Sequence, residues 1–222
     1  MNNKLHLDSN TTSFEKKETV RKNYDTIAED YANEFGFYTE DLDVYDELAK
    51  YLDKDSKVLD LGAGTGLELI ELFKKLPDTR VTAVDISENM LEKLKERDFK
   101  DKVTTICGNF FYVDFGDNYD AVISTSALHH FLMKDKIDLY KKIYDSLKEG
   151  GIFLNSDKIV LTNQEELDAI DFFNENINVK PHIDTPLSIE HEVEVLKESG
   201  FTEIEVSEVD KENYRLFKAY KR

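Results

Sequence analysis

The segment Val58–Gly66, VLDLGAGTG, constrains the fold more than any other part of the chain. An apolar run bounded by a turn is typical of a buried strand, and a helical pattern follows it to about Leu76. A strand, a glycine-rich turn and a helix in this order form the first half of a βαβ unit. Glycines in such a turn let the backbone approach a ligand closely. The segment therefore favours a nucleotide-like ligand at the carboxyl end of a strand.

Strands and helices alternate along the rest of the chain. A helix follows Ser87, with Met90, Leu91 and Leu94 as its apolar stripe, and another is expected over 134–148. This alternation predicts an α/β, Rossmann-like, doubly wound fold with a mostly parallel seven-stranded sheet and an antiparallel C-terminal strand. The strands are expected at 57–61, 80–84, 103–106, 119–124, 151–155, 202–209 and 214–220.

The N-terminal quarter has a different pattern. Residues 1 to about 13 lack periodicity and are expected to be mobile, whereas apolar residues recur at three and four over 14–35, which predicts an amphipathic helix. A second helix is expected over 41–52. We therefore divide the chain into a helical cap or lid, residues 1–52, and a ligand-binding domain, residues 53–222.

Composition restricts the partners. The chain has 222 residues, of which 29 are basic and 47 acidic, and its net charge of −18 works against a broad phosphate-binding surface. Nucleic acid is thus an unfavoured partner, although tRNA is not excluded. No run of 18 apolar residues predicts a membrane span. The single cysteine, Cys107, lies inside a predicted strand and is expected to be buried; it cannot form an internal disulfide, which agrees with a cytoplasmic location.

Polar residues follow the first three predicted strands. Asp60 stands directly before the glycines, where its carboxylate would repel a pyrophosphate but would tolerate an ammonium or a sulfonium. Asp85 lies 19 residues beyond Gly66, where an acid can accept hydrogen bonds from ribose hydroxyls. The amide of Asn109 can read the edge of an adenine. A ligand with an adenosine, a positive charge and no phosphate fits S-adenosylmethionine better than NAD or ATP.

These residues carry a family resemblance. The segments VLDLGAGTGLELIEL and VTAVDISENMLEKLKER resemble the first two motifs of class I S-adenosylmethionine-dependent methyltransferases, and the likeness continues through YDAVISTSALHHF and LKEGGIFLNSD to ESGF. It implies methyl transfer from S-adenosylmethionine by in-line displacement. The family often has an acid where this chain has Asn109, whose carbonyl still leaves adenine recognition possible. The cofactor-binding residues that the resemblance implies are Asp60, Gly62, Ala63, Gly64, Gly66, Asp85, Ile86, Met90, Asn109, Phe110 and Ser124.

The acceptor side has four candidate catalytic residues. His129 and His130 follow the fourth strand, and a neighbouring pair cannot both point into a pocket from an extended segment, so we expect at least one to be structural. Asp157 follows the fifth strand. Tyr24 belongs to RKNYDTIAEDYANEF, which resembles the helix that closes over the cofactor in many small-molecule methyltransferases. A small-molecule acceptor is therefore expected, and a general base is needed only if the acceptor carries a proton when it attacks.

Further side chains are weaker candidates. Tyr31 is expected in the core, and Tyr38 or Tyr45 could line the mouth of the site. His182, Asp184 and His191 are potential metal ligands, but they do not form a compact signature, and no resident metal is expected.

Three alternative functions share some of these features. A tRNA wobble-uridine modifier or a carboxy-S-adenosylmethionine synthase has a similar core and cap, and would need a cation for the extra carboxylate, with Arg215 as the nearest candidate. A non-catalytic regulator would bind the cofactor without transferring its methyl group. A dehydrogenase would bind a nicotinamide cofactor, which Asp60 disfavours. The acceptor and the oligomeric state stay open.

Overall fold

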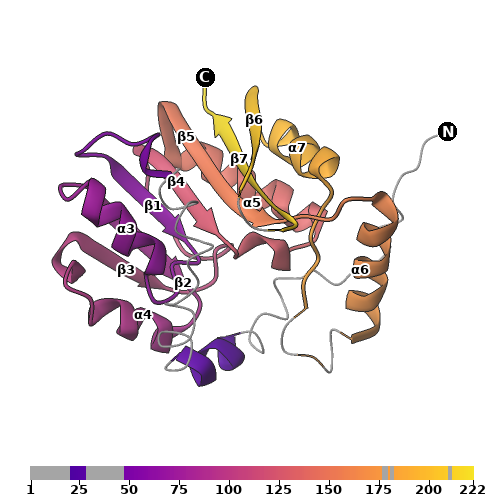
Figure 1. Cartoon of the computed structure of the whole chain (residues 1–222), viewed down its shortest axis with the longest axis horizontal. Coiled ribbons are helices and arrows are strands. Elements are labelled where there is room, and N and C mark those ends of the chain that lie inside the picture. Colours follow the sequence, from indigo (N-terminus) through magenta and orange to yellow (C-terminus); the bar gives the residue numbers. More distant parts are fainter. Residues whose placement is uncertain (1–20, 29–47, 177–179, 181–182, 210–211) are drawn as a thin grey trace.

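The structure is a computed structural model, and it describes residues 21–28, 48–176, 180, 183–209 and 212–222 (Figure 1). Most of the predicted cap, 1–52, lies outside these residues, as does the start of the chain that we expect to be mobile. The boundary at residue 53 therefore stays a prediction. The same applies to four side chains that the sequence singled out, namely Tyr31, Tyr38, Tyr45 and His182.

A seven-stranded sheet in the order β3-β2-β1-β4-β5-β7-β6 forms the centre of the molecule. Neighbouring strands are parallel from β3 to β5, while β7 is antiparallel to both β5 and β6. The Rossmann-like α/β fold with an antiparallel C-terminal strand is thus confirmed. The strands are β1 (Lys57–Leu61), β2 (Arg80–Asp85), β3 (Val103–Cys107), β4 (Tyr119–Thr125), β5 (Leu147–Lys158), β6 (Glu203–Glu208) and β7 (Tyr214–Tyr220).

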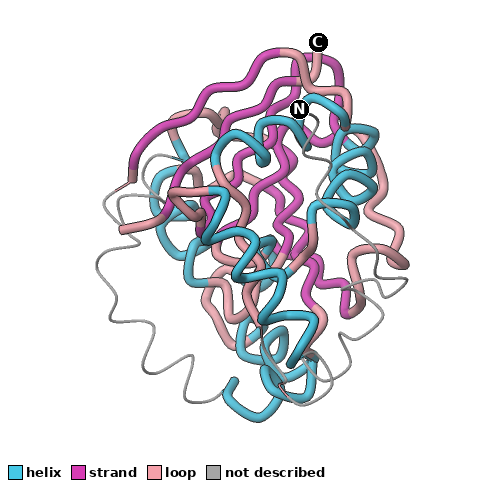
Figure 2. Tube along the Cα trace, turned by 90° about the vertical axis from the view of Figure 1, so that its right-hand side faces the viewer, coloured by secondary structure: helices cyan, strands magenta, loops and turns pink. Residues whose placement is uncertain are grey.

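Two apolar clusters fill the space between the sheet and its helices. One contains Leu69 of α3 and Leu91 of α4, and the other contains Tyr140 of α5 and Leu196 of α7. Figure 2 shows the strands running between helices. The described helices are α3 (Leu67–Lys75), α4 (Glu88–Lys95), α5 (Met133–Ser146), α6 (Asn163–Asn176) and α7 (Ile189–Glu198). Ser87 caps α4 as predicted, because its hydroxyl accepts the N–H of Met90 at 3.2 Å.

The order of the strands creates a crevice. From β1 the chain moves outward through β2 to β3 and then returns to β4 on the other side of β1. Connections therefore leave β1 and β4 in opposite directions, and in parallel sheets ligands bind at the carboxyl ends of strands at such a switch point. The fold thus places the glycine turn after β1 and the histidines after β4 at the same edge of the sheet.

The strand β5 begins earlier than expected. Leu147 already pairs with Tyr119, directly after α5 ends at Ser146, whereas the sequence predicted a helix to 148 and a strand from 151. Pairing with β4 is irregular up to Ala121, which faces Ile152, and Gly150 has a positive φ of 76°. The two glycines at 150 and 151 therefore mark an irregularity inside the strand rather than its start.

The prediction that Cys107 is buried is wrong. Cys107 is exposed, because β3 is the edge strand of the sheet and is only partly covered. Partial burial and the acids Glu88 and Asp85 raise the pKa of its thiol. The thiol form is therefore favoured over the thiolate.

A helical segment, residues 21–28, packs beside the start of α4. The carboxylate of Asp25 accepts the hydroxyl of Ser87 at 2.6 Å, and its carbonyl accepts the side-chain amide of Asn89 at 2.8 Å. In Figure 1 this segment lies at the bottom of the view, in indigo, and α6 lies to the right of the sheet. Residues 21–28 of the predicted cap are thus fixed to the β2–α4 connection.

Candidate functional site

One pocket opens at the carboxyl ends of β1, β2 and β4 and has about 730 Å³ of empty space, including its open mouth. It brings together the glycine turn, the end of β2, the turn after β3 and the loop after β4. None of the described residues that line it is Lys or Arg. The lining residues are Tyr24, Gly62, Gly64, Asp85, Ile86, Met90, Gly108, Asn109, Phe110, Thr125, Ser126, Ala127, His130 and Phe131.

The glycine turn needs glycine for two different reasons. A Cβ on Gly62, at φ +83°, would collide with the side chain of Ala127. A Cβ on Gly64, at φ +50°, would meet no atom closer than the Gly62 carbonyl oxygen at 3.9 Å. Because Gly64 lines the pocket, that Cβ would point toward open space that a ligand can fill. Gly64 therefore lets a ligand lie directly on the backbone.

The other two residues of this turn do not line the pocket. Ala63 is buried, and its N–H points to the carbonyl of Val84 at 3.3 Å. Gly66 precedes α3 in a left-handed conformation, and its N–H donates to the carbonyl of Ala63 at 2.7 Å. Both residues shape the turn on which a ligand would rest.

Asp85 connects the glycine turn to α4. One carboxylate oxygen accepts the N–H of Gly64 at 2.9 Å, and the other accepts the N–H of Ser87 at 2.8 Å. Burial raises the pKa of Asp85, and these backbone donors oppose the rise. Each oxygen keeps a second lone pair, so a ribose hydroxyl that reaches this pocket wall can still donate to it.

Asp60 is a buried acid, and among the described residues neither of its side-chain oxygens has a hydrogen-bond donor in suitable geometry. Burial and the neighbouring carboxyl group of Glu68 raise the pKa of Asp60 well above its ordinary value. Glu68 is itself buried at the start of α3. Two acids this close and dry share a proton more readily than they both ionise. The pair therefore favours a cation, which would compensate its negative charge.

Apolar side chains flank the side of the pocket where an adenine is expected. Ile86 and Met90 line it from the β2–α4 connection, and Phe110 lines it from the turn after β3. Asn109 is also there, but its side-chain oxygen accepts the N–H of Phe111 at 3.0 Å. An adenine amine would therefore use the second lone pair of that oxygen.

The end of β4 contributes residues that sequence reasoning partly missed. Ser124 is fully buried, and its hydroxyl donates to the carbonyl of Leu61 at 2.8 Å, so it joins β4 to β1 instead of lining the pocket. Thr125 lines the pocket instead, and Ser126 and Ala127 were missed. Ser126 has a positive φ of 53°, a strained conformation that no sequence motif announces. Phe131, also missed, packs against Phe110 with ring centroids 6.0 Å apart.

His129 is buried beneath the pocket and does not line it. Its Nδ1 lies 2.5 Å from one oxygen of Asp157, whose other oxygen accepts the N–H of Leu128 at 3.0 Å. Burial alone would raise the pKa of Asp157, but His129 and the more distant Lys136 outweigh it and hold the pKa below its ordinary value. Asp157 was expected to face the acceptor, and the structure has it under the histidine that it orients.

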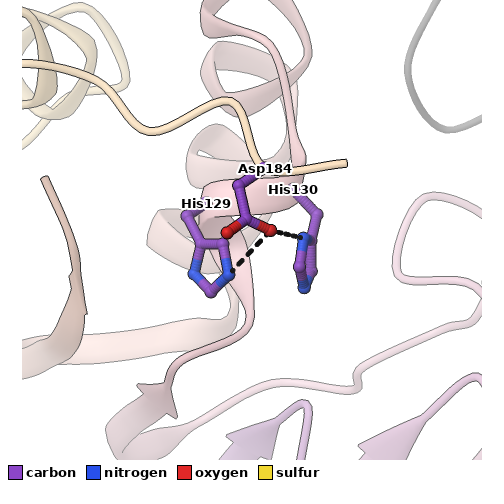
Figure 3. Close-up of side chains that lie close together, drawn as sticks. All are labelled: His129, His130 and Asp184. Atoms are coloured by element: carbon purple, nitrogen blue, oxygen red, sulfur yellow. Dashed lines mark ion pairs between the residues drawn. The ribbon is translucent and has the colours of Figure 1, made fainter. Parts of the chain in front are cut away.

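His130 is the histidine that lines the pocket, and it faces two partners. Its Nε2 lies 3.4 Å from the hydroxyl of Tyr24, and its Nδ1 lies 3.3 Å from an oxygen of Asp184. The same Asp184 oxygen lies 3.6 Å from Nε2 of His129. Figure 3 shows the carboxylate of Asp184 between the two imidazole rings. Both histidines of the turn Leu128–His130 are buried, but only His130 lines the pocket.

Two other sequence candidates lie outside the pocket lining. The guanidinium of Arg215 donates to the carbonyl of Tyr214 at 2.7 Å and lies 3.6 Å from Glu208. His191 belongs to α7, where its Nδ1 lies 2.8 Å from the buried carboxyl of Glu166. Neither arrangement points to a ligand. Within the described residues, no helix combines the length and apolar character that crossing a membrane requires.

Comparisons with known proteins identify relatives of this chain. Residues 58–151 match a family model described as a methyltransferase domain. The chain is 31% identical over 188 residues to the carboxy-S-adenosyl-L-methionine synthase of Nautilia profundicola, which covers 77% of this chain and 80% of that protein. It is 33% identical over 106 residues to the malonyl-[acyl-carrier protein] O-methyltransferase of Priestia megaterium, over 48% of this chain and 38% of that protein.

A solved structure shows the same fold. Human N-acetylserotonin methyltransferase, solved in complex with S-adenosylmethionine, superposes with a TM-score of 0.63 at 19% identity, covering 93% of this chain and 56% of that chain. The long match to the Nautilia relative and the family model over β1 to β5 extend the likeness from fold to sequence. The chain therefore belongs to the class I S-adenosylmethionine-dependent methyltransferases.

Proposed function

We propose that this enzyme transfers the methyl group of S-adenosylmethionine to a small molecule that enters beside Tyr24 and His130. The acceptor atom attacks the methyl carbon in line, the carbon–sulfur bond breaks, and its electron pair stays on sulfur, which leaves S-adenosylhomocysteine. Alignment of the two reactants and exclusion of water supply much of the acceleration in such a displacement.

The residues present fit this cofactor. Bound S-adenosylmethionine supplies an electrophilic methyl group on a positively charged sulfur. The open face of Gly64 leaves space for it, and the buried carboxyl of Asp60, four residues earlier in the chain, would attract its ammonium group through charge. Asp85 would accept the ribose hydroxyls, while Ile86 and Met90, which also line the pocket, would flank the adenine. Ser124 supports this site indirectly, because its hydroxyl joins the end of β4 to the end of β1.

Residues on the acceptor side hold the nucleophile and manage its proton. His130 lines the pocket and takes the proton of an acceptor hydroxyl or carboxyl group through one ring nitrogen. Tyr24 orients His130, because its hydroxyl lies 3.4 Å from Nε2 of the imidazole ring. His129 and Asp157 act beneath it as positioning residues, because Asp157 fixes the ring of His129.

One observation carries this proposal. A single pocket joins the open glycine turn, the acid of the expected ribose site and a histidine, at the switch point of a sheet of this family.

An exposed Cys107 thiol favours a reducing compartment, so we further propose that the enzyme works in the cytoplasm.

Calorimetric titration tests the cofactor side of the proposal. We expect S-adenosylmethionine and S-adenosylhomocysteine to bind, and NAD and ATP not to bind. The variant Asp85→Ala should lose at least tenfold in affinity. Its matched control is Asp120→Ala. Asp120 also accepts a backbone N–H, that of Lys57 at 2.6 Å, but it lies at the amino-terminal ends of β1 and β4, away from the pocket. Equal affinities in both variants would contradict the site. An acceptor screen by release of S-adenosylhomocysteine then tests methyl transfer.

A second candidate is the synthesis of carboxy-S-adenosylmethionine. The 31% identity to the Nautilia synthase over most of both chains favours it. The charge of the pocket speaks against it, because a carboxylated sulfonium needs a cation and the described lining contains neither Lys nor Arg. Mass spectrometry of nucleosides that co-purify with the protein separates the two candidates: S-adenosylhomocysteine, the product of methyl transfer, supports the first, and a species heavier than S-adenosylmethionine by one carboxyl group supports the synthase.

A further inference from the structure

We propose that His129, His130 and Asp184 bind one divalent transition-metal ion at the acceptor side of the pocket. One ligand atom from each of the three residues lies within 4.8 Å of the others. The two histidines are buried and Asp184 is partly exposed, so the site has a dry floor and one side toward solvent. The residues come from two segments more than 50 positions apart, which is why the sequence predicted no compact metal signature.

The distances suit a shared cation better than direct hydrogen bonds. One oxygen of Asp184 lies 3.6 Å from Nε2 of His129 and 3.3 Å from Nδ1 of His130 (Figure 3). Charge-assisted hydrogen bonds are shorter, about 2.7–2.9 Å between the heavy atoms. Two ligands that are each about 2.1 Å from a tetrahedral ion lie about 3.4 Å apart. The two separations from the Asp184 oxygen match that edge length, and the two histidine nitrogens lie within 4.8 Å of each other.

A second, independent contact points in the same direction. Asp157 accepts from Nδ1 of His129 at 2.5 Å, so the Nε2 atom that faces Asp184 carries the lone pair when the ring is neutral. Metal-binding histidines almost always donate their other ring N–H to a carboxylate or carbonyl in this way. Asp157 therefore has the place of an outer-shell partner that orients the ligand.

The loop that carries Asp184 is held against the histidines. The N–H and the hydroxyl of Thr185 both donate to the carbonyl of His129, at 2.7 and 3.2 Å. Lys158 binds the other oxygen of Asp184 at 2.8 Å, which leaves the first oxygen toward the rings. The three ligands are thus positioned before any ion arrives, and an ion loses less ordering energy on binding.

The ligand set selects the class of ion. Two imidazole nitrogens and one carboxylate oxygen suit zinc, ferrous iron or cobalt, whereas magnesium and calcium prefer oxygen ligands. Three protein ligands leave a further position open. His130 borders the pocket, so an acceptor oxygen can take that position. With the ion bound, His130 is a ligand and not the base: the ion lowers the pKa of the acceptor proton, and the proton passes to solvent. This role, unlike binding of the ion itself, rests on the proposed methyl transfer.

Cobalt titration of the tag-free full chain, after dialysis against a chelator, tests the site. We expect visible d–d absorption that saturates at one equivalent of Co²⁺ and is displaced by Zn²⁺. Asp184→Asn should weaken Co²⁺ binding at least tenfold, as should His130→Ala. The matched control is His191→Gln, which removes another histidine paired with a carboxylate and should bind Co²⁺ as the unchanged chain does.

The outcomes separate this proposal from the proposed function. Asp184 is partly exposed, so its variant should keep its circular dichroism spectrum even if a variant of buried His129 does not fold. A folded chain that binds no Co²⁺, or equal affinities for Asp184→Asn and His191→Gln, overturns the metal site. Binding of S-adenosylmethionine, measured on the same metal-free sample, is independent of that result: its absence would contradict the proposed function and leave the metal site standing.

Discussion

The two halves of the pocket are built in different ways. The proposed cofactor half comes from the carboxyl ends of β1 and β2 and uses mainly backbone: the open face of Gly64 and the N–H groups that Asp85 holds. It also contains an acid, Asp60, whose buried oxygens have no hydrogen-bond donor among the described residues. The acceptor half comes from the ends of β4 and β5 and uses side chains that already bind one another, such as His129 and Asp157. One half relies on backbone that is open to a ligand, and the other half relies on side chains that hold one another in place.

This difference explains what the sequence could predict. Gly62, Gly64 and Asp85 lie within 24 residues, and each is required by backbone geometry, so a short motif announces them. Most of the sheet was predictable for a similar reason, because alternation along each strand is local. The exceptions were the start of β5, which depends on an irregularity against β4, and the exposure of Cys107, which depends on the order of the strands.

The acceptor half could not be predicted in this way. Asp184 reaches the histidines only because a loop more than 50 residues later folds back onto the carbonyl of His129. Nothing in the sequence indicates that contact. Ser124 shows the reverse case: its position at the end of β4 predicted a ligand contact, but its hydroxyl satisfies the carbonyl of Leu61. Which of several neighbouring polar residues turns inward depends on tertiary packing.

The largest effect that would distinguish the two halves is expected at Gly64. Gly64→Val should reduce the affinity for S-adenosylmethionine at least a hundredfold, because the new side chain occupies the space where the cofactor approaches the backbone. Calorimetric titration measures this affinity. Gly150→Val is the matched control, since Gly150 also has a positive φ, at 76°, and lies in β5 far from the carboxyl end. If Gly150→Val weakened binding as much, backbone strain alone would explain the loss.

The next effect sharpens the acceptor half. Asp157→Asn should lower the free energy of unfolding by about 2 kcal/mol at neutral pH and leave the cofactor affinity within twofold, because it breaks a buried pair with His129. The folded-state pKa of Asp157 is lowered, so its stabilisation is complete above the ordinary carboxyl pKa and is lost as the pH falls through the folded value. Urea unfolding should show the variant and the unchanged chain converging in acid; a gap that stays constant with pH would contradict this.

A smaller effect is expected at Asp60, with opposite signs for binding and stability. Asp60→Asn should weaken S-adenosylmethionine binding by roughly tenfold and raise the stability of the free protein by about 1 kcal/mol, because a buried acid beside Glu68 is removed. The raised pKa makes folded Asp60 a better proton binder, so its destabilisation grows as the pH rises through the folded value.

The raised pKa of Asp60 also makes cofactor binding depend on pH. An ammonium group binds the ionised form of Asp60, so affinity should increase as the pH rises through its pKa, and protons should be released on binding. Titrations in two buffers of different ionisation enthalpy measure that release. Equal heats in both buffers would show that Asp60 is already ionised in the free protein.

The smallest effect concerns the contact between the halves. Tyr24→Phe removes a single hydroxyl that lies 3.4 Å from His130, so stability should change by less than about 0.5 kcal/mol and cofactor affinity by less than threefold. Thermal unfolding and calorimetry measure both. A tenfold loss of cofactor affinity would assign Tyr24 to the cofactor half.

Tyr24 and Asp25 are consecutive residues, yet they contact opposite sides of the pocket. Tyr24 reaches His130 on the acceptor side, while Asp25 holds Ser87 and Asn89 beside the expected ribose site. The helical segment 21–28 cannot bend between two neighbouring residues without losing helical hydrogen bonds. Any movement of segment 21–28 therefore changes both contacts together. In the proposed function, substrate entry and cofactor exchange therefore both depend on segment 21–28 at this wall of the pocket.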